Sequence, residues 1–127
     1  MEKKHRILII DDSRDTVEGL SCFLGQKHDV IKAYNGFDGL QALENSEKKI
    51  DLVITDLLMP ELSGAGVISI VKKKYPGTPV IAITGWVGNT VLLAHQTKAD
   101  QVLNKPFDLE CLEAHVVKLL LNNSHSN

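Results

Sequence analysis

The segment at residues 7–12 reads Ile-Leu-Ile-Ile-Asp-Asp, so four consecutive aliphatic residues run directly into two acids. Side chains of a strand alternate between the two faces of a sheet, and a continuous aliphatic run is therefore covered on both faces. Such burial is typical of a parallel sheet with helices packed on each side. Four further aliphatic runs follow, at residues 30–31, 52–54, 80–83 and 102–103. The second run is short and is flanked by His28 and Lys32, and we expect it at an edge of the sheet.

Helical patterns separate these runs. Ser13 or Asp12 can cap a first helix, because short polar side chains accept hydrogen bonds from free backbone N–H groups. The other helices are expected to begin after Asn35, from about Gly64, near Asn89 and after Asp108. The apolar positions of the five patterns are Val17, Leu20 and Leu24; Phe37, Leu40 and Leu43; Val67, Ile70 and Val71; Val91, Leu92 and Leu93; and Leu109, Leu112, Val116 and Leu119. At this spacing we expect them to form the inward faces.

Five strands alternating with five helices predict an α/β protein with a doubly wound, flavodoxin-like parallel sheet and helices on both faces. Crossovers between parallel strands are right-handed, and the strand order expected for this arrangement is 2-1-3-4-5. The first and third strands are neighbours in that order. Ligands of such sheets bind beyond the carboxyl ends of the strands, at the point where the chain reverses direction.

The composition fits one ordinary globular domain. The chain has 127 residues, of which 43% are hydrophobic and 24% charged, and its formal net charge is −2. This charge gives no basis for non-specific binding to nucleic acid or anionic lipid. No apolar run approaches the ~20 residues of a membrane span, and the first residues do not fit a signal peptide, so we expect a cytoplasmic protein. Residues 1–121 are expected to form the domain and residues 122–127 a polar tail.

The two cysteines, Cys22 and Cys111, both fall inside helical patterns. We expect two reduced, buried thiols, because a free cysteine behaves as a small apolar residue. The chain contains no Cys-x-x-Cys pair, and a redox or zinc site therefore has no support.

Polar residues stand at the carboxyl end of each central run. Asp11 and Asp12 follow the first run and Asp56 closes the third, whereas Thr84 closes the fourth and Lys105 follows the fifth. Three carboxylates brought together repel one another, and a bound cation relieves the repulsion. A set of oxygen ligands without histidine or cysteine suits a hard ion such as Mg²⁺. A single acid at a strand end is usually only solvated, but a pair beside a third acid indicates a site.

A carboxylate beside Mg²⁺ can attack a phosphoryl group and form an acyl phosphate. Such a transfer needs mainly alignment and neutralisation of the equatorial oxygens. Lys105 would pair with one of these oxygens, and the Thr84 hydroxyl would donate to another together with backbone amides. Each residue type at each strand end therefore has a role in phosphoryl transfer.

The combination of these motifs resembles the signature of response-regulator receiver domains, the chemotaxis-regulator-like switches of two-component signal transduction. The residues that carry the resemblance are Asp11-Asp12, Asp56-Leu57-Leu58-Met59-Pro60 with Gly64, Thr84, and Lys105-Pro106-Phe107. Each element alone is weak, but the elements in this order are specific. The resemblance extends from about Ile7 to Leu121, nearly the whole chain.

The resemblance implies a role for each residue. Asp56 would be the phosphoacceptor, Asp12 would ligate Mg²⁺ directly, and Asp11 would act mainly through water. The backbone carbonyl of Leu58 would be a further metal ligand. Thr84 and Lys105 would contact the phosphoryl group, and the bond from Lys105 to Pro106 would be cis.

The resemblance also implies a phosphoprotein switch and not a turnover enzyme, with at most self-phosphorylation and autodephosphorylation. A sensor histidine kinase or a phosphotransfer protein would donate the phosphoryl group. The face made by the fourth helix, fifth strand and fifth helix would then engage an unknown protein target. No direct contact with nucleic acid and no membrane insertion are expected.

Two positions depart from the family pattern. Val102 stands where most receivers carry Tyr or Phe, whose rotation is coupled to movement of the threonine; the signal would then leave through the loop after the fourth strand or through the fourth helix. In that loop Gly85 permits close backbone approach, and Trp86 follows it. We hypothesise that Trp86 and Leu58 shield the acyl phosphate from water.

Other functions fit the sequence less well. A haloacid-dehalogenase-type phosphohydrolase would carry its nucleophile on the first strand in an Asp-x-Asp pattern and a cap insertion, whereas this chain has adjacent Asp11 and Asp12. A flavodoxin-like nucleotide binder would need a glycine-rich loop after that strand. A receiver-like interaction module that has lost phosphorylation is disfavoured by the complete set of acids. The five histidines are not expected to serve a metal site or a phosphorelay, because none shares a strand end with the acids.

Overall fold

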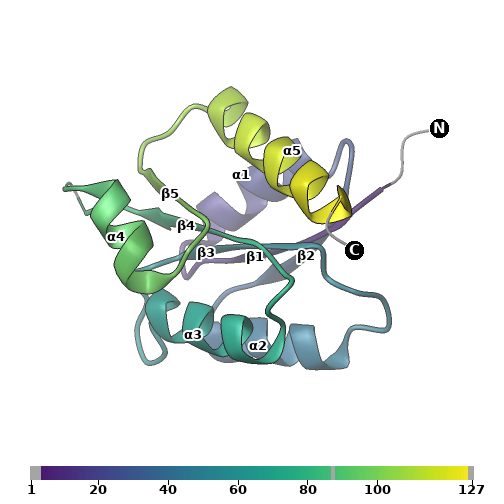
Figure 1. Ribbon diagram of the computed structural model, residues 1–127, viewed down its shortest axis with the longest axis horizontal. Helices are drawn as coiled ribbons and strands as arrows, with labels where there is room; N and C mark the ends of the chain where they lie inside the picture. The colour runs from purple at the N-terminus through teal and green to yellow at the C-terminus, as the bar shows by residue number, and fades with distance from the viewer. Residues whose placement is uncertain (1–3, 87, 126–127) are drawn as a thin grey trace.

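The sheet is parallel and has the expected strand order. The computed structural model describes residues 4–86 and 88–125, and its five strands are ordered β2-β1-β3-β4-β5 (Figure 1). The strands are β1 (Arg6–Ile10), β2 (Asp29–Ala33), β3 (Leu52–Asp56), β4 (Val80–Thr84) and β5 (Gln101–Asn104). The weakest aliphatic run forms the edge strand β2, as predicted.

Five helices cover the two faces of the sheet. They are α1 (Arg14–Leu24), α2 (Gly36–Asn45), α3 (Gly64–Lys74), α4 (Thr90–Thr97) and α5 (Leu109–His125). Figure 1 shows α1 and α5 on one face and α2 and α3 on the other. Helix α5 includes residues 122–125, which were expected in a polar tail, and residues 126–127 lie outside the described part of the chain. None of the helices in the described ranges is long and apolar enough to cross a membrane.

The aliphatic run of β1 contributes to two separate cores, as its continuous pattern predicted. Ile7 and Ile9 pack with α1 and α5, whereas Leu8 and Ile10 pack with α2 and α3. All four side chains are fully buried. Burial of one such side chain contributes about 1.5–3 kcal/mol. Because both faces of β1 are packed in this way, the strand has a fixed position in the sheet, and so do the acids that follow it.

Side-chain caps start four of the helices. Ser13 caps α1 and Asn35 caps α2, each accepting a hydrogen bond from the backbone N–H three residues later. Ser63 does the same for α3, and Asn89 for α4. Replacing such a cap with alanine typically costs about 1 kcal/mol. Of the two caps considered for α1, Ser13 is the one used, which leaves the Asp12 carboxylate available to the site.

Several expected inward positions are wrong. Phe37 is 57% exposed, and α2 instead packs through Gly36, Gly39 and Leu43. A side chain at Gly39 would collide with Ile10, with its Cβ only 2.3 Å from Cδ1. The close approach of α2 to the sheet therefore depends on small residues, and the neighbouring aromatic ring is left at the surface.

Helices α4 and α5 also differ in detail from the pattern. Val91 and Leu92 are 79% and 50% exposed, and α4 has no fully buried residue. In α5 the buried stripe is Leu112, Val116 and Leu120, while Leu109 is exposed. Helix α4 thus leaves an apolar surface, which the apolar pattern alone could not distinguish from a buried face.

The expected burial of the two thiols is wrong. Cys22 and Cys111 are both free and exposed. Cys22 lies between Leu20 and Leu24 in sequence, but at 100° per residue it points away from the stripe that they form. Cys111 precedes Leu112 and is likewise turned away from the sheet. Both thiols are therefore open to solvent.

Candidate functional site

The strand ends bring together the acids predicted from the sequence. β1 and β3 are direct neighbours, with Ile10 paired to Thr55, so Asp11 and Asp56 emerge side by side. Carboxylate oxygens of Asp11, Asp12 and Asp56 all lie within 4.8 Å of one another. Asp11 and Asp56 are 0% and 5% exposed, whereas Asp12 is exposed. The cluster is thus buried on the sheet side and open to solvent on the side of Asp12.

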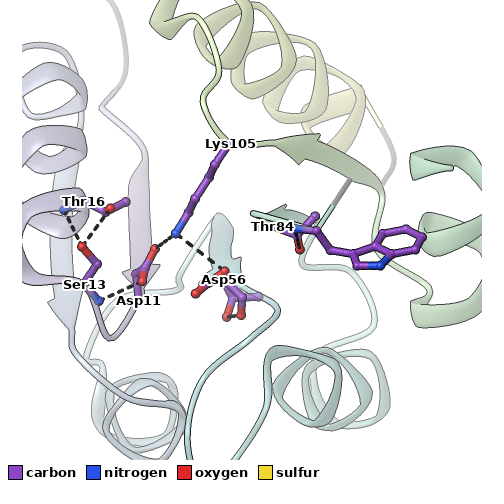
Figure 2. Close-up of polar contacts among 8 residues, drawn as sticks. Asp11, Ser13, Thr16, Asp56, Thr84 and Lys105 are labelled. Carbon is purple, nitrogen blue, oxygen red and sulfur yellow. Dashed lines mark hydrogen bonds and ion pairs between the residues drawn. The ribbon is translucent and has the colours of Figure 1, made fainter. Parts of the chain in front are cut away.

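Lys105 bridges the two buried acids. Its Nζ lies 2.9 Å from Oδ2 of Asp11 and 3.7 Å from Oδ1 of Asp56. Figure 2 shows the lysine side chain reaching from the end of β5 into the gap between the two carboxylates. The peptide bond to Pro106 is cis, as the resemblance implied. One ammonium thus faces three carboxylates, and the cluster retains net negative charge.

Backbone contacts hold the acids in place. The Asp11 carboxylate accepts a hydrogen bond from the backbone N–H of Ser13 at 2.9 Å. Directly after β3, the Leu57 N–H donates to the Ile83 carbonyl at 2.9 Å, and the Gly64 N–H donates to the Leu57 carbonyl at 3.0 Å. A Cβ at Gly64 would lie 2.0 Å from the Asp56 carbonyl oxygen. The start of α3 therefore packs directly on the backbone that carries the acid.

The environment of Asp56 raises its pKa to about 6, mainly because burial disfavours the charged carboxylate. Repulsion from Asp11 and, to a smaller extent, from Asp12 acts in the same direction. The Lys105 ammonium and the backbone N–H of Leu58 lower the pKa but do not compensate. A carboxylate in this position gains from a cation placed among the acids.

Ionisation of Asp56 should lower the stability of the metal-free domain. Its folded-state pKa of about 6 lies above the ordinary value of 3.8, so the folded chain binds more protons than the unfolded chain between these values. The contribution of this group to the unfolding free energy should be largest below pH 4 and fall by about 3 kcal/mol as the pH rises through 6. Urea denaturation in EDTA measures this, with Asp56→Asn as the reference. A difference between the two proteins that stays constant across this range would contradict the raised pKa.

Thr84 lies on the other side of Asp56 from Asp11 (Figure 2). Its side chain is 1% exposed, and its hydroxyl oxygen accepts a hydrogen bond from the Trp86 backbone N–H at 3.0 Å. The described contacts include no hydrogen bond from this hydroxyl to Asp56. Thr84 therefore borders the acidic cluster, with its hydroxyl oxygen accepting from the β4–α4 loop.

The remaining predicted site residues differ in their exposure. Leu58 and Trp86 are 66% and 51% exposed, and the Trp86 ring packs on Gly88, where an added Cβ would lie 1.9 Å from a ring carbon. Gly85, which precedes Trp86 in the loop, is exposed, and Val102 is buried in the core. Asn104, which the sequence analysis did not single out, donates from its side-chain amide to the Trp86 carbonyl. The feature of the sequence that could have indicated this contact is a polar residue directly before Lys105.

The comparisons with known proteins agree with this geometry. Residues 7–117 match the family described as "Response regulator receiver domain". The chain is 32% identical over 122 residues to the transcription factor SKN7 of Saccharomyces cerevisiae, covering 94% of this chain and 19% of that protein. It is 34% identical over 113 residues to the transcriptional regulatory protein GlrR of Escherichia coli, covering 87% and 25%. The chain therefore spans about a fifth to a quarter of the length of these relatives.

Solved structures show the same fold. A response regulator receiver domain protein from Clostridium thermocellum superposes with a TM-score of 0.86 at 28% identity, covering 94% of this chain and 97% of that one. The BeF3-activated receiver domain of DrrB, a Thermotoga maritima protein, gives 0.83 at 29% identity, covering 93% and 98%. Together with the match over residues 7–117, these likenesses show that the chain belongs to the family of response regulator receiver domains.

Proposed function

We propose that this receiver domain is a phosphorylation-activated switch in which Asp56 accepts the phosphoryl group. One observation carries the proposal: the Asp56 carboxylate is nearly buried, lies within 4.8 Å of two further carboxylates, and is paired with the Lys105 ammonium on one side. An acid that only terminates a strand would be solvated and would not gather this set of charges. A sensor histidine kinase or a phosphotransfer protein is the proposed donor, and the cytoplasm the expected location.

The acids fit a bound Mg²⁺ ion by their chemistry. All three offer oxygen ligands, and their charge exceeds that of the single ammonium. Asp12 would hold the ion directly, together with Asp56 and the Leu58 carbonyl, and Asp11 would act mainly through water. When bound, Mg²⁺ neutralises negative charge on the carboxylates and on the incoming phosphoryl oxygens.

The chain's own residues align the transfer. A carboxylate oxygen of Asp56 attacks phosphorus, the new O–P bond replaces the bond between phosphorus and the donor atom, and the donor leaves with that electron pair. Lys105 pairs with one equatorial oxygen, and Thr84 donates to another after turning toward it. Because these groups belong to the receiver, we expect self-phosphorylation from small donors such as acetyl phosphate, followed by autodephosphorylation.

The proposed output is contact with a protein target through α4, β5 and α5. Helix α4 supports this assignment, because Val91 and Leu92 are 79% and 50% exposed and leave an apolar surface beside the loop that carries Trp86. Exposed apolar side chains gathered on one helix are typical of protein interaction sites. The formal net charge of −2 favours a protein partner over direct binding to nucleic acid.

The test combines intact mass with fluorescence of Trp86, the only tryptophan. Mg²⁺ and acetyl phosphate should add one phosphoryl group of about 80 Da and change the indole emission, and EDTA should prevent both effects. A phosphorylation-independent interaction module would show neither change, and a phosphohydrolase would release phosphate continuously without a stable mass gain.

Leu58 and Trp86 are expected to slow hydrolysis of the acyl phosphate. Both are large, exposed apolar side chains; Leu58 follows β3, which carries Asp56, and Trp86 follows the neighbouring strand β4. At these positions we expect them to limit the approach of water. Leu58→Asn and Trp86→Ala should each shorten the phosphate lifetime several-fold, measured by loss of label from the isolated phosphoprotein. Val91→Ala shortens an exposed apolar side chain on α4 and serves as control. Lifetimes equal to wild type in both variants would refute the shielding hypothesis.

A further inference from the structure

Three hydrogen bonds connect the ends of β4 and β5, and two of them involve the backbone of Trp86. The Trp86 N–H donates to the Thr84 hydroxyl at 3.0 Å, and the Trp86 carbonyl accepts from the side-chain amide of Asn104. Thr84 and Asn104 are also partners in the strand register, and the Lys105 N–H donates to the Thr84 carbonyl at 2.8 Å. The Trp86 residue is thus held on its N–H side by one strand end and on its carbonyl side by the other.

Asn104 takes the place of a contact that Val102 cannot make. The two residues are separated by one position on β5 and so point to the same face of the sheet. Val102 is 3% exposed and lies in the core against which Leu93 of α4 packs. Its side chain has no polar atom, so it cannot form a hydrogen bond that is made or broken when Thr84 moves. The side chain on this face of β5 that bonds the β4–α4 loop is Asn104.

We propose that Asn104 is a positioning residue that holds Thr84 in its unphosphorylated arrangement, an inference that rests on the proposed phosphorylation of Asp56. To donate to a phosphoryl oxygen, the Thr84 side chain must turn, and its oxygen then ceases to accept from the Trp86 N–H. The bond from Asn104 to the Trp86 carbonyl opposes the accompanying shift of the loop. Asn89, the N-cap of α4, follows Trp86 by three residues. Loss of the two Trp86 hydrogen bonds would therefore allow the start of α4, and with it the apolar surface of this helix, to move.

Removing the donor should therefore make activation easier. Asn104→Leu keeps a similar side-chain shape but cannot donate. Because one hydrogen bond biases a two-state equilibrium by a modest factor, we expect beryllofluoride with Mg²⁺ to bind the variant about fivefold more tightly than wild type. Titration followed by Trp86 fluorescence gives the affinity. Gln101→Leu, which removes an amide at the other end of β5, is the control and should leave the affinity unchanged.

A double variant separates positioning from a general structural effect. In a Thr84→Val background the hydroxyl that Trp86 bonds is absent, and Asn104→Leu should no longer change beryllofluoride affinity. Asn104→Ala tests the same loss with a smaller side chain, should the leucine fail to fold. The proposal is supported if Asn104→Leu tightens beryllofluoride binding in wild type but not in the Thr84→Val background. It is overturned if Asn104→Leu and Asn104→Ala both bind beryllofluoride with unchanged or lower affinity. If wild type binds no beryllofluoride, or Asp56→Asn binds it equally well, the proposed function fails instead.

Discussion

Asp56→Asn should abolish the mass gain of about 80 Da that wild type shows with Mg²⁺ and acetyl phosphate. The amide is a poor nucleophile, and the substitution removes one of the three carboxylates whose oxygens lie within 4.8 Å of one another. The Trp86 fluorescence change should vanish with the mass gain, because it follows from the movement of Thr84. Intact-protein mass spectrometry and emission spectra on the same sample measure both.

The variant should fold at least as well as wild type. Asp56 has a pKa raised to about 6 by burial and by Asp11, so a neutral side chain removes an unfavourable charge at pH 7. Asp29→Asn, which replaces an exposed aspartate on β2, provides the matched control and should phosphorylate normally. Phosphorylation of the Asp56→Asn protein to the wild-type extent would identify a different acceptor and end the proposal.

Lys105→Met should slow phosphoryl transfer by about 10²–10³. The methionine retains most of the length of the lysine stem but loses the ammonium that lies 2.9 Å from Asp11 and 3.7 Å from Asp56. Negative charge developing on the phosphoryl oxygens then lacks its counter-ion, and the pKa of Asp56 rises further because its main lowering influence is gone. The initial rate of mass gain at saturating Mg²⁺ measures the loss.

Two further variants delimit the role of the lysine. Lys105→Arg keeps the charge but replaces a compact ammonium with a planar guanidinium, and it should recover only part of the rate. Lys72→Met removes a lysine that pairs with Asp100 at 2.6 Å, away from the acids, and should leave the transfer rate unchanged even if stability falls. A Lys105→Met rate within twofold of wild type would show that the ammonium does not assist transfer.

The sheet and the acidic cluster could be predicted because both depend on sequence order alone. Continuous aliphatic runs indicated strands covered on both faces, and parallel strands end at one edge, so residues that follow each run must meet there. Asp11 and Asp56 meet for this reason, without any contact that needs to be known beforehand. The burial of Val17, Leu20 and Leu24 on α1 follows equally from helical spacing.

The wrong expectations for Phe37 and for the two cysteines have different origins. Phe37 was expected inward on α2, but Gly39 brings the helix backbone close to Ile10 and Gly36 brings it close to Leu62, so the packed face is the glycine face. Cys22 and Cys111 were assigned by residue type although their helical phase points outward. The direction of Phe37 depends on neighbours in three dimensions, which an apolar pattern does not contain, whereas the direction of the two cysteines follows from the helical spacing of the buried stripes.

The link between Asn104 and Trp86 could not be predicted for a related reason. A side-chain amide at a strand end can donate in several directions, and its partner is chosen by a loop whose course depends on Thr84 and on the ring packing of Trp86 on Gly88. The resemblance to receiver domains indicated only that Val102 lacks the aromatic ring that most receivers carry at this position. It gave no indication that a neighbouring residue contacts the same loop.

The contact between Gly64 and the backbone of Asp56 constrains how the length of this chain can vary. There is no space for even one added carbon at Gly64, so the start of α3 cannot shift relative to Asp56. An insertion or deletion within residues 57–63 would therefore displace the Leu58 carbonyl, the proposed metal ligand, from the acids. Residues 47–49 lie before β3, at the other end of that strand, and are all exposed. In a random insertion library, phosphorylation-competent clones should accumulate at the latter segment and be absent from the former.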